Sequence, residues 1–273
     1  MTTPPPARPR RPQLNLTVRE RRRLSPSMVR VVLGVDEPER YEDVVPPEKY
    51  VKLVFLDPAV DHGPDPDYWA LRESLPPEHR PVTRHLTIRR WIPERAELWM
   101  DFVLHGDTGH AGPWAARAEP GQRIIALGPG GKWVPDPQAR WTLVAADDAA
   151  LPAALAVLEF LPATARGEAV LEVGSRADVL PVTGPAGVAV RWVFREEGGS
   201  LPEAVHAAGW PEGTAGVQAF AHGEREAMKA LRRELLEVRG LERSQVSLSG
   251  YWARGRTEDV FQAEKKLPVG RIL

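Results

Sequence analysis

Cysteine is absent from the 273 residues of the chain. Disulfides, thiolate zinc sites, cysteine-ligated iron–sulfur clusters and cysteine nucleophiles are therefore excluded. The sequence also lacks an apolar run of the roughly 20 residues that a membrane-spanning helix requires. Its basic N-terminus has no apolar segment of the kind found in signal peptides. We therefore expect a cytoplasmic protein without a membrane span.

A large excess of either charge is also missing, since 36 Lys and Arg residues against 37 Asp and Glu give a net charge of −1. A general nucleic-acid-binding protein usually carries a clear basic excess, so we expect no nucleic-acid partner. Apolar residues make up 42% of the chain, which supports one large or two medium domains. The nine tryptophans suit either packing or a pocket for a flat ligand.

The first half of the chain has the pattern of a small antiparallel barrel. Short β-branched or alternating segments are separated by polar breaks, which is typical of strands. We expect strands at residues 14–18, 28–33, 50–55, 86–91, 98–104 and 123–127. The Pro- and Asp-rich residues 57–81 predict a long loop with a short helix near residues 68–72. The barrel domain is expected over residues 14–136, after a Pro- and Arg-rich disordered tail, residues 1–13.

The second half, residues 137–273, alternates between strand and helix patterns. The apolar run 141–146 suits a buried parallel strand. Further strands are expected at 168–173, 188–194, 217–221 and 246–251, and helices at 149–161, 201–208 and 224–239. This alternation predicts a doubly wound, Rossmann-like parallel sheet, followed by a C-terminal tail. Such sheets bind ligands beyond the carboxyl ends of their strands.

A glycine-rich turn, residues 105–112, lies between the expected strand 98–104 and a short helix at 114–118 opened by Pro113. Free backbone N–H groups at such a helix start suit a phosphate. On spacing alone, a tight turn without a ligand is the better interpretation, because glycine most often occurs where the backbone must adopt a conformation that other residues avoid.

Several short blocks place this turn in context. In chain order they read RHLTIR (84–89), HGDTG (105–109), WAARA (114–118), GPGG (128–131), ALPA (150–153) and GYWARG (250–255). Together they resemble the siderophore-interacting protein family, over about residues 24–266. The resemblance implies a flavin-binding barrel followed by an NAD(P)H-binding-type domain. It also implies a ferric-siderophore reductase in which NAD(P)H reduces FAD, and FAD reduces Fe(III) so that iron is released.

The resemblance implies particular cofactor contacts. Arg84 matches an arginine that pairs with the flavin pyrophosphate, Thr87 matches a hydroxyl that bonds the flavin, and Leu86 stands where a tyrosine packs on the isoalloxazine. The other positions expected to contact cofactor are Arg89, His105, Gly109, Ala111, Gly112, Trp114, Asp147 and Trp252. A core histidine that fixes the turn is an equal alternative for His105, since histidine serves both roles.

Four departures from the family pattern fall at cofactor positions. Leu86 replaces tyrosine, Gly112 replaces serine, Ala146 replaces glycine and Ala149 replaces threonine. They leave open whether FAD is retained and make NAD(P)H use doubtful. The alternative is a flavin-poor descendant that uses the interdomain cleft for non-redox chemistry, as a biosynthetic cyclase does, or only for binding.

Three basic residues, Lys52, Arg254 and Lys265, match family positions that imply contact with an anionic ferric siderophore. Clustered cations would hold such a ligand, whereas scattered solvated charge is the alternative. His222 replaces an alanine of the family at an expected strand end. It is a speculative acid–base group, and a plain polar residue at the mouth of the site is the preferred interpretation. No residue is assigned to a metal site.

Overall fold

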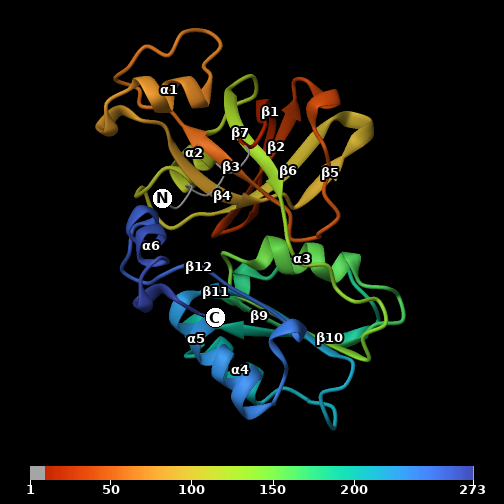
Figure 1. The fold of residues 1–273 in the computed structure, drawn as a ribbon. Coiled ribbons are helices and arrows are strands. Elements are labelled where there is room, and N and C mark those ends of the chain that lie inside the picture. The colour runs from red at the N-terminus through yellow and green to blue at the C-terminus, as the bar shows by residue number, and fades with distance from the viewer. Residues whose placement is uncertain (1–9, 273) are drawn as a thin grey trace, which may run out of the picture.

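The computed structural model describes residues 10–272, which form two sheets that follow one another along the chain (Figure 1). The first is a seven-stranded antiparallel sheet in the order β4-β3-β7-β1-β2-β6-β5, and the second is a five-stranded parallel sheet in the order β10-β9-β8-β11-β12. The predicted fold class, a barrel-type antiparallel domain followed by a doubly wound parallel sheet, is confirmed. The antiparallel sheet is barrel-like but does not close, since no pairing joins β4 to β5 within the described residues.

The strands of the first sheet are β1 (Gln13–Ser25), β2 (Met28–Val35), β3 (Tyr50–Phe55), β4 (Val82–Thr87), β5 (Arg90–Ile92), β6 (Glu97–Val103) and β7 (Arg123–Gly130). β1 is longer than expected. Leu14, Leu16 and Val18 point into the core, but residues 19–23 are all exposed while their backbone continues to pair with β2. The alternating apolar signal therefore stops before the strand does.

The single strand expected at residues 86–91 is wrong, because the chain changes partners in the middle of this segment. β4 pairs with β3 and β5 pairs with β6, at opposite edges of the sheet. Between them, the Ile88 N–H donates to Lys49 O and the Arg89 N–H donates to Trp99 O, both at 2.8 Å. The segment expected as one strand thus contains a crossing between two sheet edges.

Two short helices belong to the first half. α1 (Tyr68–Ser74) lies in the long loop, as predicted, and Asp67 caps it by accepting a hydrogen bond of 2.7 Å from the Ala70 N–H. α2 (Ala111–Arg117) follows the glycine turn and begins three residues before the expected start at residue 114. Pro113 therefore lies within the first turn, where its missing N–H has no helical partner to lose.

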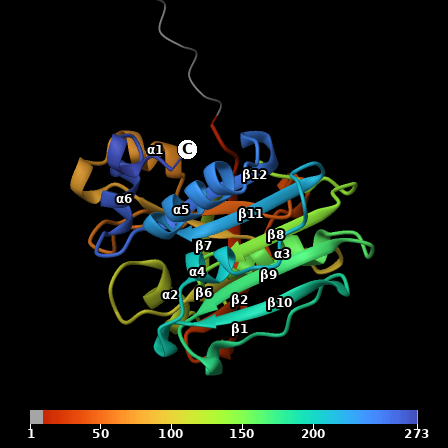
Figure 2. The same ribbon diagram turned by 90° about the horizontal axis from the view of Figure 1, so that it is seen from below.

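The strands of the second sheet are β8 (Trp141–Ala146), β9 (Arg166–Val173), β10 (Gly187–Phe194), β11 (Val217–Glu224) and β12 (Val246–Trp252), and every pair is parallel. α3 (Leu151–Phe160) packs on one face. α4 (Leu201–His206) and α5 (Arg225–Arg232), which continues as a π-helical turn (Arg233–Val238), pack on the other (Figure 2).

The C-terminal segment is more ordered than the expected tail. It forms α6 (Glu258–Glu264), capped by the Thr257 hydroxyl and anchored by the buried side chain of Phe261. In Figure 1, α6 lies between the two halves of the molecule, close to β4 and α2. The expected tail at residues 1–13 falls mostly outside the described residues, and β1 begins at Gln13.

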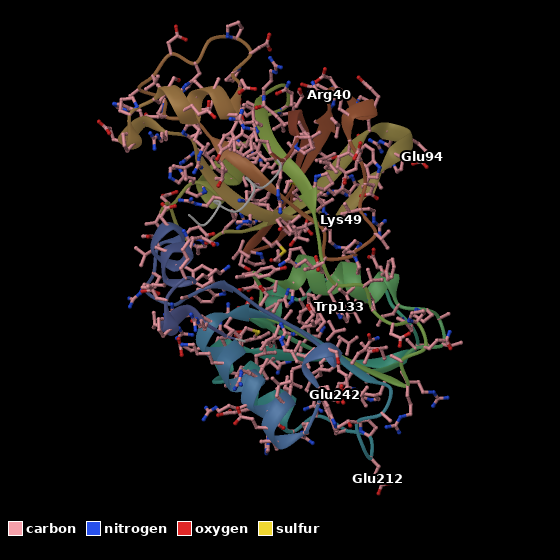
Figure 3. The ribbon with its side chains drawn as sticks, viewed as in Figure 1. Arg40, Lys49, Glu94, Trp133, Glu212 and Glu242 are labelled. Atoms are coloured by element: carbon pink, nitrogen blue, oxygen red, sulfur yellow. The ribbon has the colours of Figure 1, made fainter. Side chains whose placement is uncertain are left out.

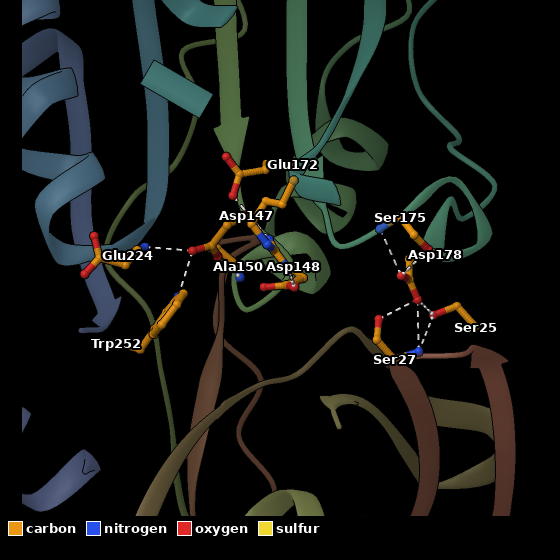
Figure 4. A network of polar contacts seen from close by, with 11 residues as sticks. Ser25, Ser27, Asp147, Asp148, Ala150, Glu172, Ser175, Asp178, Glu224 and Trp252 are labelled. Carbon is orange, nitrogen blue, oxygen red and sulfur yellow. Dashed lines mark hydrogen bonds and ion pairs between the residues drawn. The ribbon is translucent and has the colours of Figure 1, made fainter. Parts of the chain in front are cut away.

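Polar and apolar contacts join the two halves. Met28 of the β1–β2 hairpin is buried against the core that α3 covers. Asp178, from the second half, accepts hydrogen bonds from the Ser25 hydroxyl (3.0 Å) and from the N–H (2.9 Å) and hydroxyl (2.6 Å) of Ser27 (Figure 4). Trp133 lies between the sheets (Figure 3). These contacts hold the two sheets against each other.

Candidate functional site

Strand alternation sorts the residues of the RHLT block onto two faces of β4. Arg84 and Leu86 lie on one face and His85 and Thr87 on the other, because successive side chains of a strand point in opposite directions. In the register with β3, Lys52 pairs with His85 and Tyr50 pairs with Thr87. Arg84 and Leu86 therefore lie on the face of β4 toward the glycine turn, and His85 and Thr87 lie on the face toward the parallel sheet.

Arg84 lies beside the glycine turn, as the sequence predicts. Its guanidinium, whose side chain is 12% exposed, donates two hydrogen bonds of 3.0 and 3.1 Å to the carboxylate of Asp259 on α6. Partial burial, and then the nearby charge of Arg84, lower the pKa of His110 in the turn. The arginine, the turn and the start of α6 thus meet at one place, and a carboxylate occupies the guanidinium donors.

The glycine turn has the backbone freedom that a close ligand approach requires. Gly106 and Gly109 both have φ of +83°, and an added Cβ at either would meet nothing within 4 Å. Gly109 also lines a shallow hollow of about 400 Å³ together with His110, Pro113, Trp114, Arg117 and Gln122. His105 is exposed rather than part of the core.

Gly112, unlike the two turn glycines, is buried, and an added Cβ would lie 3.2 Å from Val103 O. A side chain at this position needs a small backbone shift. Ala111 is the first residue of α2.

Leu86, on the same face of β4 as Arg84, and Trp114 of α2 supply apolar surface in this half of the molecule; we call these two side chains the apolar wall. Both are partly buried and pack against the core of the barrel-like sheet. The Trp114 ring lies against Phe55 and Phe102, with centroid distances of 6.2 and 5.6 Å. An apolar surface beside a guanidinium suits a ligand that is flat at one end and anionic at the other.

Cations gather on the opposite face of β4. His85 is more than a third exposed, yet partial burial, and then the charges of Lys52, Lys265 and Arg11, lower its pKa to about 4. Arg11 donates a hydrogen bond of 2.8 Å to the Tyr50 hydroxyl. We call Arg11, Lys52 and Lys265 the cation cluster; within residues 10–272 none of them forms an ion pair with a carboxylate. The nearby charge of Glu258 offsets only that of Lys265, so the cluster keeps a net positive charge that fits an anion.

The structure brings together two of the three basic residues that sequence analysis singled out. Arg254 is exposed, and its backbone N–H donates to Glu224 Oε1 at 3.1 Å, but no described contact joins it to the cation cluster. Arg11 was missed because it lies in the expected tail. The only signal for it was its position three residues before the first predicted strand.

Asp147 and Trp252 hold each other at the carboxyl edge of the parallel sheet. Asp147 is 2% exposed and accepts hydrogen bonds from Trp252 Nε1 (2.7 Å), the Glu224 N–H (2.7 Å) and the Ala150 N–H (3.2 Å) (Figure 4). Burial, and then the charge of Asp148, raise the pKa of Asp147 to about 7. The carboxylate thereby ties three strand ends together, and its acceptors are used within the protein.

Arg89 joins the two halves of the molecule by an ion pair. It is 8% exposed and pairs with Glu159 of α3, which Arg90 also contacts at 2.7 Å. His222 is also inside the protein, 5% exposed, and not at an open mouth. Burial, and then the charge of Lys265, lower its pKa to about 3, so the ring is neutral at physiological pH.

Two other properties bound the chemistry of the site. Within residues 10–272, no group of three or more His, Asp or Glu side chains is arranged to hold a metal ion. In the same part of the chain, no helix combines the length and the apolar character needed to cross a bilayer.

Comparisons with known proteins agree with this architecture. Residues 17–133 match the model of the siderophore-interacting FAD-binding domain, and residues 139–255 match that of the siderophore-interacting protein. An uncharacterized protein of Mycobacterium tuberculosis is 42% identical over 90% of this chain and 92% of its own. The ferric vibriobactin reductase ViuB of Vibrio cholerae is 34% identical over 69% of this chain and 71% of its own.

A solved structure gives the same result. The siderophore-interacting protein SipS of Aeromonas hydrophila superposes with a TM-score of 0.78 at 30% identity, covering 94% of this chain and 97% of that one. The chain belongs to the siderophore-interacting protein family.

The residues present fit FAD. Arg84 offers a planar pair of donors next to a turn in which the space around Gly106 and Gly109 is open. The hydrogen bonds to the Asp259 carboxylate show that these donors can bind an anion. Leu86 and Trp114 supply apolar surface beside them. Arginine and glycine-rich backbone are the groups that bind a pyrophosphate well.

Proposed function

We propose that the protein is an FAD-mediated, NAD(P)H-dependent ferric-siderophore reductase. The observation that carries the proposal is the meeting of Arg84 with the glycine turn, on a strand whose other face borders the cation cluster. One strand thus separates a site for the cofactor from a site for an anionic substrate. A protein that uses NAD(P)H draws on a cytoplasmic pool, so a cytoplasmic location is part of the proposal.

On this proposal Arg84 binds the FAD pyrophosphate in place of Asp259, Leu86 covers one face of the isoalloxazine, and Thr87 lies at its edge. Bound FAD accepts two electrons and passes them on one at a time. The protein supplies orientation and charge. The other expected cofactor contacts, including His105 and Ala111, remain predictions.

The cation cluster is the proposed site for the ferric siderophore. Arg11, Lys52 and Lys265 face the same imidazole, and a ligand with negative charge would relieve their mutual repulsion. The pKa of Lys52 reflects this repulsion, because burial, and then the charges of Arg11 and Arg72, lower it. Arg254 contributes less on this proposal, because no described contact places it with the others.

Nicotinamide use is proposed to be slow. Ala146 is fully buried, and Asp147 is engaged by Trp252 and by the Glu224 N–H. Doubly wound sheets bind nucleotides at the carboxyl ends of their strands. At the end of β8 the polar groups that would contact a nucleotide are already hydrogen-bonded within the protein.

A flavin-poor protein that binds or transforms a small organic molecule is the second candidate. Two observations favour it: the Arg84 donors are already satisfied by Asp259, and Leu86 cannot stack as an aromatic ring does. FAD titration separates the two functions. Saturable binding with a perturbed flavin spectrum supports the reductase, whereas no binding at high FAD concentration favours the second candidate.

A further inference from the structure

β1 changes from an inner strand to a sheet edge halfway along its length. β7 pairs with it only over residues 13–17. The turn before β7 adds one more residue, since the Val18 N–H donates to Gln122 O at 2.8 Å and the Gly121 N–H donates to Val18 O at 2.9 Å. From residue 20 to residue 23, β2 is the only strand that pairs with β1 in the described part of the chain. The other side of this stretch is therefore an open edge of the sheet.

The side chains on this edge are charged and exposed. All five residues from 19 to 23 are exposed, and we call them the arginine edge. Their sequence is RERRR, so four arginines against one glutamate leave a net charge of +3. Within residues 10–272, Glu20 is the only carboxylate that pairs with any of these arginines, at 3.5 Å from Arg22 Nε. The arginine edge thus combines an open backbone with a positive charge that the protein does not neutralise.

The backbone of the arginine edge decides what kind of molecule can complete it. In an antiparallel ladder, alternate residues point their N–H and C=O groups away from the partner strand, so the open side offers both donors and acceptors. A peptide backbone supplies the matching acceptors and donors, whereas the phosphates of lipids and nucleic acids supply acceptors only. Binding at a bilayer surface also uses apolar side chains, and none of the five residues is apolar. An extended peptide segment is therefore the ligand that matches.

Side-chain charge decides which extended segment fits. A second copy of this chain would place arginines opposite arginines, and like charges directly opposite one another destabilise a strand pair, whereas opposite charges stabilise it. Successive side chains of a strand alternate between its faces. Arg21 and Arg23 therefore meet one face of an added strand and Arg22 meets the other, so acidic residues are favoured on both faces.

We propose that the arginine edge is a docking site for an extended acidic segment of another protein, which adds to β1 as a further strand. The docked segment lies beside the helix that follows the glycine turn, because the Arg21 guanidinium donates to Ala116 O of α2. The partner is thereby held on the barrel-like half of the molecule. This inference goes beyond the proposed function and does not depend on FAD or on a siderophore.

The test uses the purified protein and a short acetylated peptide of alternating glutamate and valine, labelled for fluorescence anisotropy. Saturable binding is expected at low salt, and it weakens as salt screens the charges. The control probe is the same peptide methylated at every backbone nitrogen, which keeps the charge but has no N–H to donate. Because main-chain hydrogen bonds give strand addition its affinity, the control is expected to bind at least about tenfold more weakly. Hydrogen exchange at the backbone amides of residues 19–23 is expected to slow when the first peptide binds.

Variants separate this site from general charge attraction. The double variant Arg21→Gln, Arg22→Gln is expected to weaken peptide binding roughly tenfold, because two cross-strand pairs of opposite charge are lost. Arg166→Gln, which removes an exposed arginine at the start of β9, is the matched control and is expected to bind as wild type does. No saturable binding by wild type, equal binding of the methylated peptide, or an equal loss in both variants would overturn strand addition.

Protection of an open edge is the other role that charged side chains can have, because they keep a second copy from pairing with it. That role alone predicts dimerisation of the double variant in sedimentation velocity and no binding of the acidic peptide by wild type, a result that would overturn the docking site. None of these measurements involves FAD. Loss of the docking site would leave the proposed function standing, and a protein that fails to bind FAD would leave the docking site standing.

Discussion

Arg84 on β4 donates two hydrogen bonds, of 3.0 and 3.1 Å, to the Asp259 carboxylate on α6. The arginine side chain is 12% exposed and the aspartate side chain 70% exposed. A C-terminal helix thus places a carboxylate against the guanidinium that is expected to bind a pyrophosphate. If FAD binds as proposed, its pyrophosphate and the Asp259 carboxylate compete for the same donors.

This competition predicts opposite effects for the two partners. Asp259→Asn is expected to tighten FAD binding by up to about fivefold, because a partly exposed ion pair contributes about 0.2–1 kcal/mol. Arg84→Ala is expected to weaken it by about 2 kcal/mol, the contribution of a lost charge-assisted contact. Both are measured by fluorescence titration with FAD.

Controls make the competition specific. Glu212 lies at the far end of the molecule from the barrel-like half (Figure 3), so Glu212→Gln removes one negative charge without touching the site. It is expected to leave FAD affinity unchanged. In the Arg84→Ala background the gain from Asp259→Asn should vanish. If that gain persists in the double variant, Asp259 acts through something other than Arg84.

Leu86→Tyr is predicted to tighten FAD binding. Leu86 lies on the same face of β4 as Arg84 and, like Trp114, packs against the core of the barrel-like sheet. Aromatic stacking contributes roughly 0.5–1.5 kcal/mol beyond area burial, so an increase of about tenfold in affinity is the upper expectation. The measurement is calorimetric titration, with Leu86→Met as the control for side-chain size. Equal affinity in the tyrosine variant would place the isoalloxazine elsewhere.

The cation cluster predicts which basic residues bind the ferric ligand. Lys52→Gln and Lys265→Gln are each expected to weaken binding of an anionic ferric siderophore by roughly tenfold at low salt, and by less as salt screens the charges. Arg254→Gln is the matched control, since Arg254 is exposed and not joined to the cluster. A loss in Arg254→Gln equal to the others would mean that the site extends across the cleft to β12.

Asp147 predicts a fall in stability between about pH 4 and pH 7. Its pKa in the folded protein is raised to about 7 from 3.8, so the folded state binds more protons than the unfolded state in this window. The free energy of unfolding therefore decreases as pH rises through it, by up to about 1.4 kcal/mol for each pKa unit of the shift. Denaturant unfolding of wild type and Asp147→Asn at pH 5 and pH 7 checks this. An equal pH dependence in both proteins would remove Asp147 as its source.

Particular residues show what the sequence could and could not predict. Leu14, Leu16 and Val18 revealed β1 because alternation records burial, but the arginines of residues 19–23 hid its second half, which is held by backbone pairing alone. The segment 86–91 looked like one strand because Leu86, Ile88 and Trp91 recur in it without a Gly or Pro break. Local periodicity carries no information on which partner a strand has.

The site was predictable to a similar extent. The RHLTIR block singled out Arg84, and matches to family positions singled out Lys52 and Asp147. Asp259 and Arg11 were not singled out, since they reach the site from chain ends that meet the barrel-like half only in the folded protein. Long-range ion pairs of this kind depend on tertiary packing, which no local pattern records.

The central claim is tested most directly by one anaerobic experiment on the FAD-saturated protein. NADPH is added while the visible flavin band is followed, and a ferric siderophore is then added with a chromogenic ferrous chelator. The account predicts slow bleaching of the flavin, followed by its return together with about two ferrous ions for each flavin. A protein that remains colourless at saturating FAD, or bound and reduced FAD that yields no ferrous iron, would contradict it.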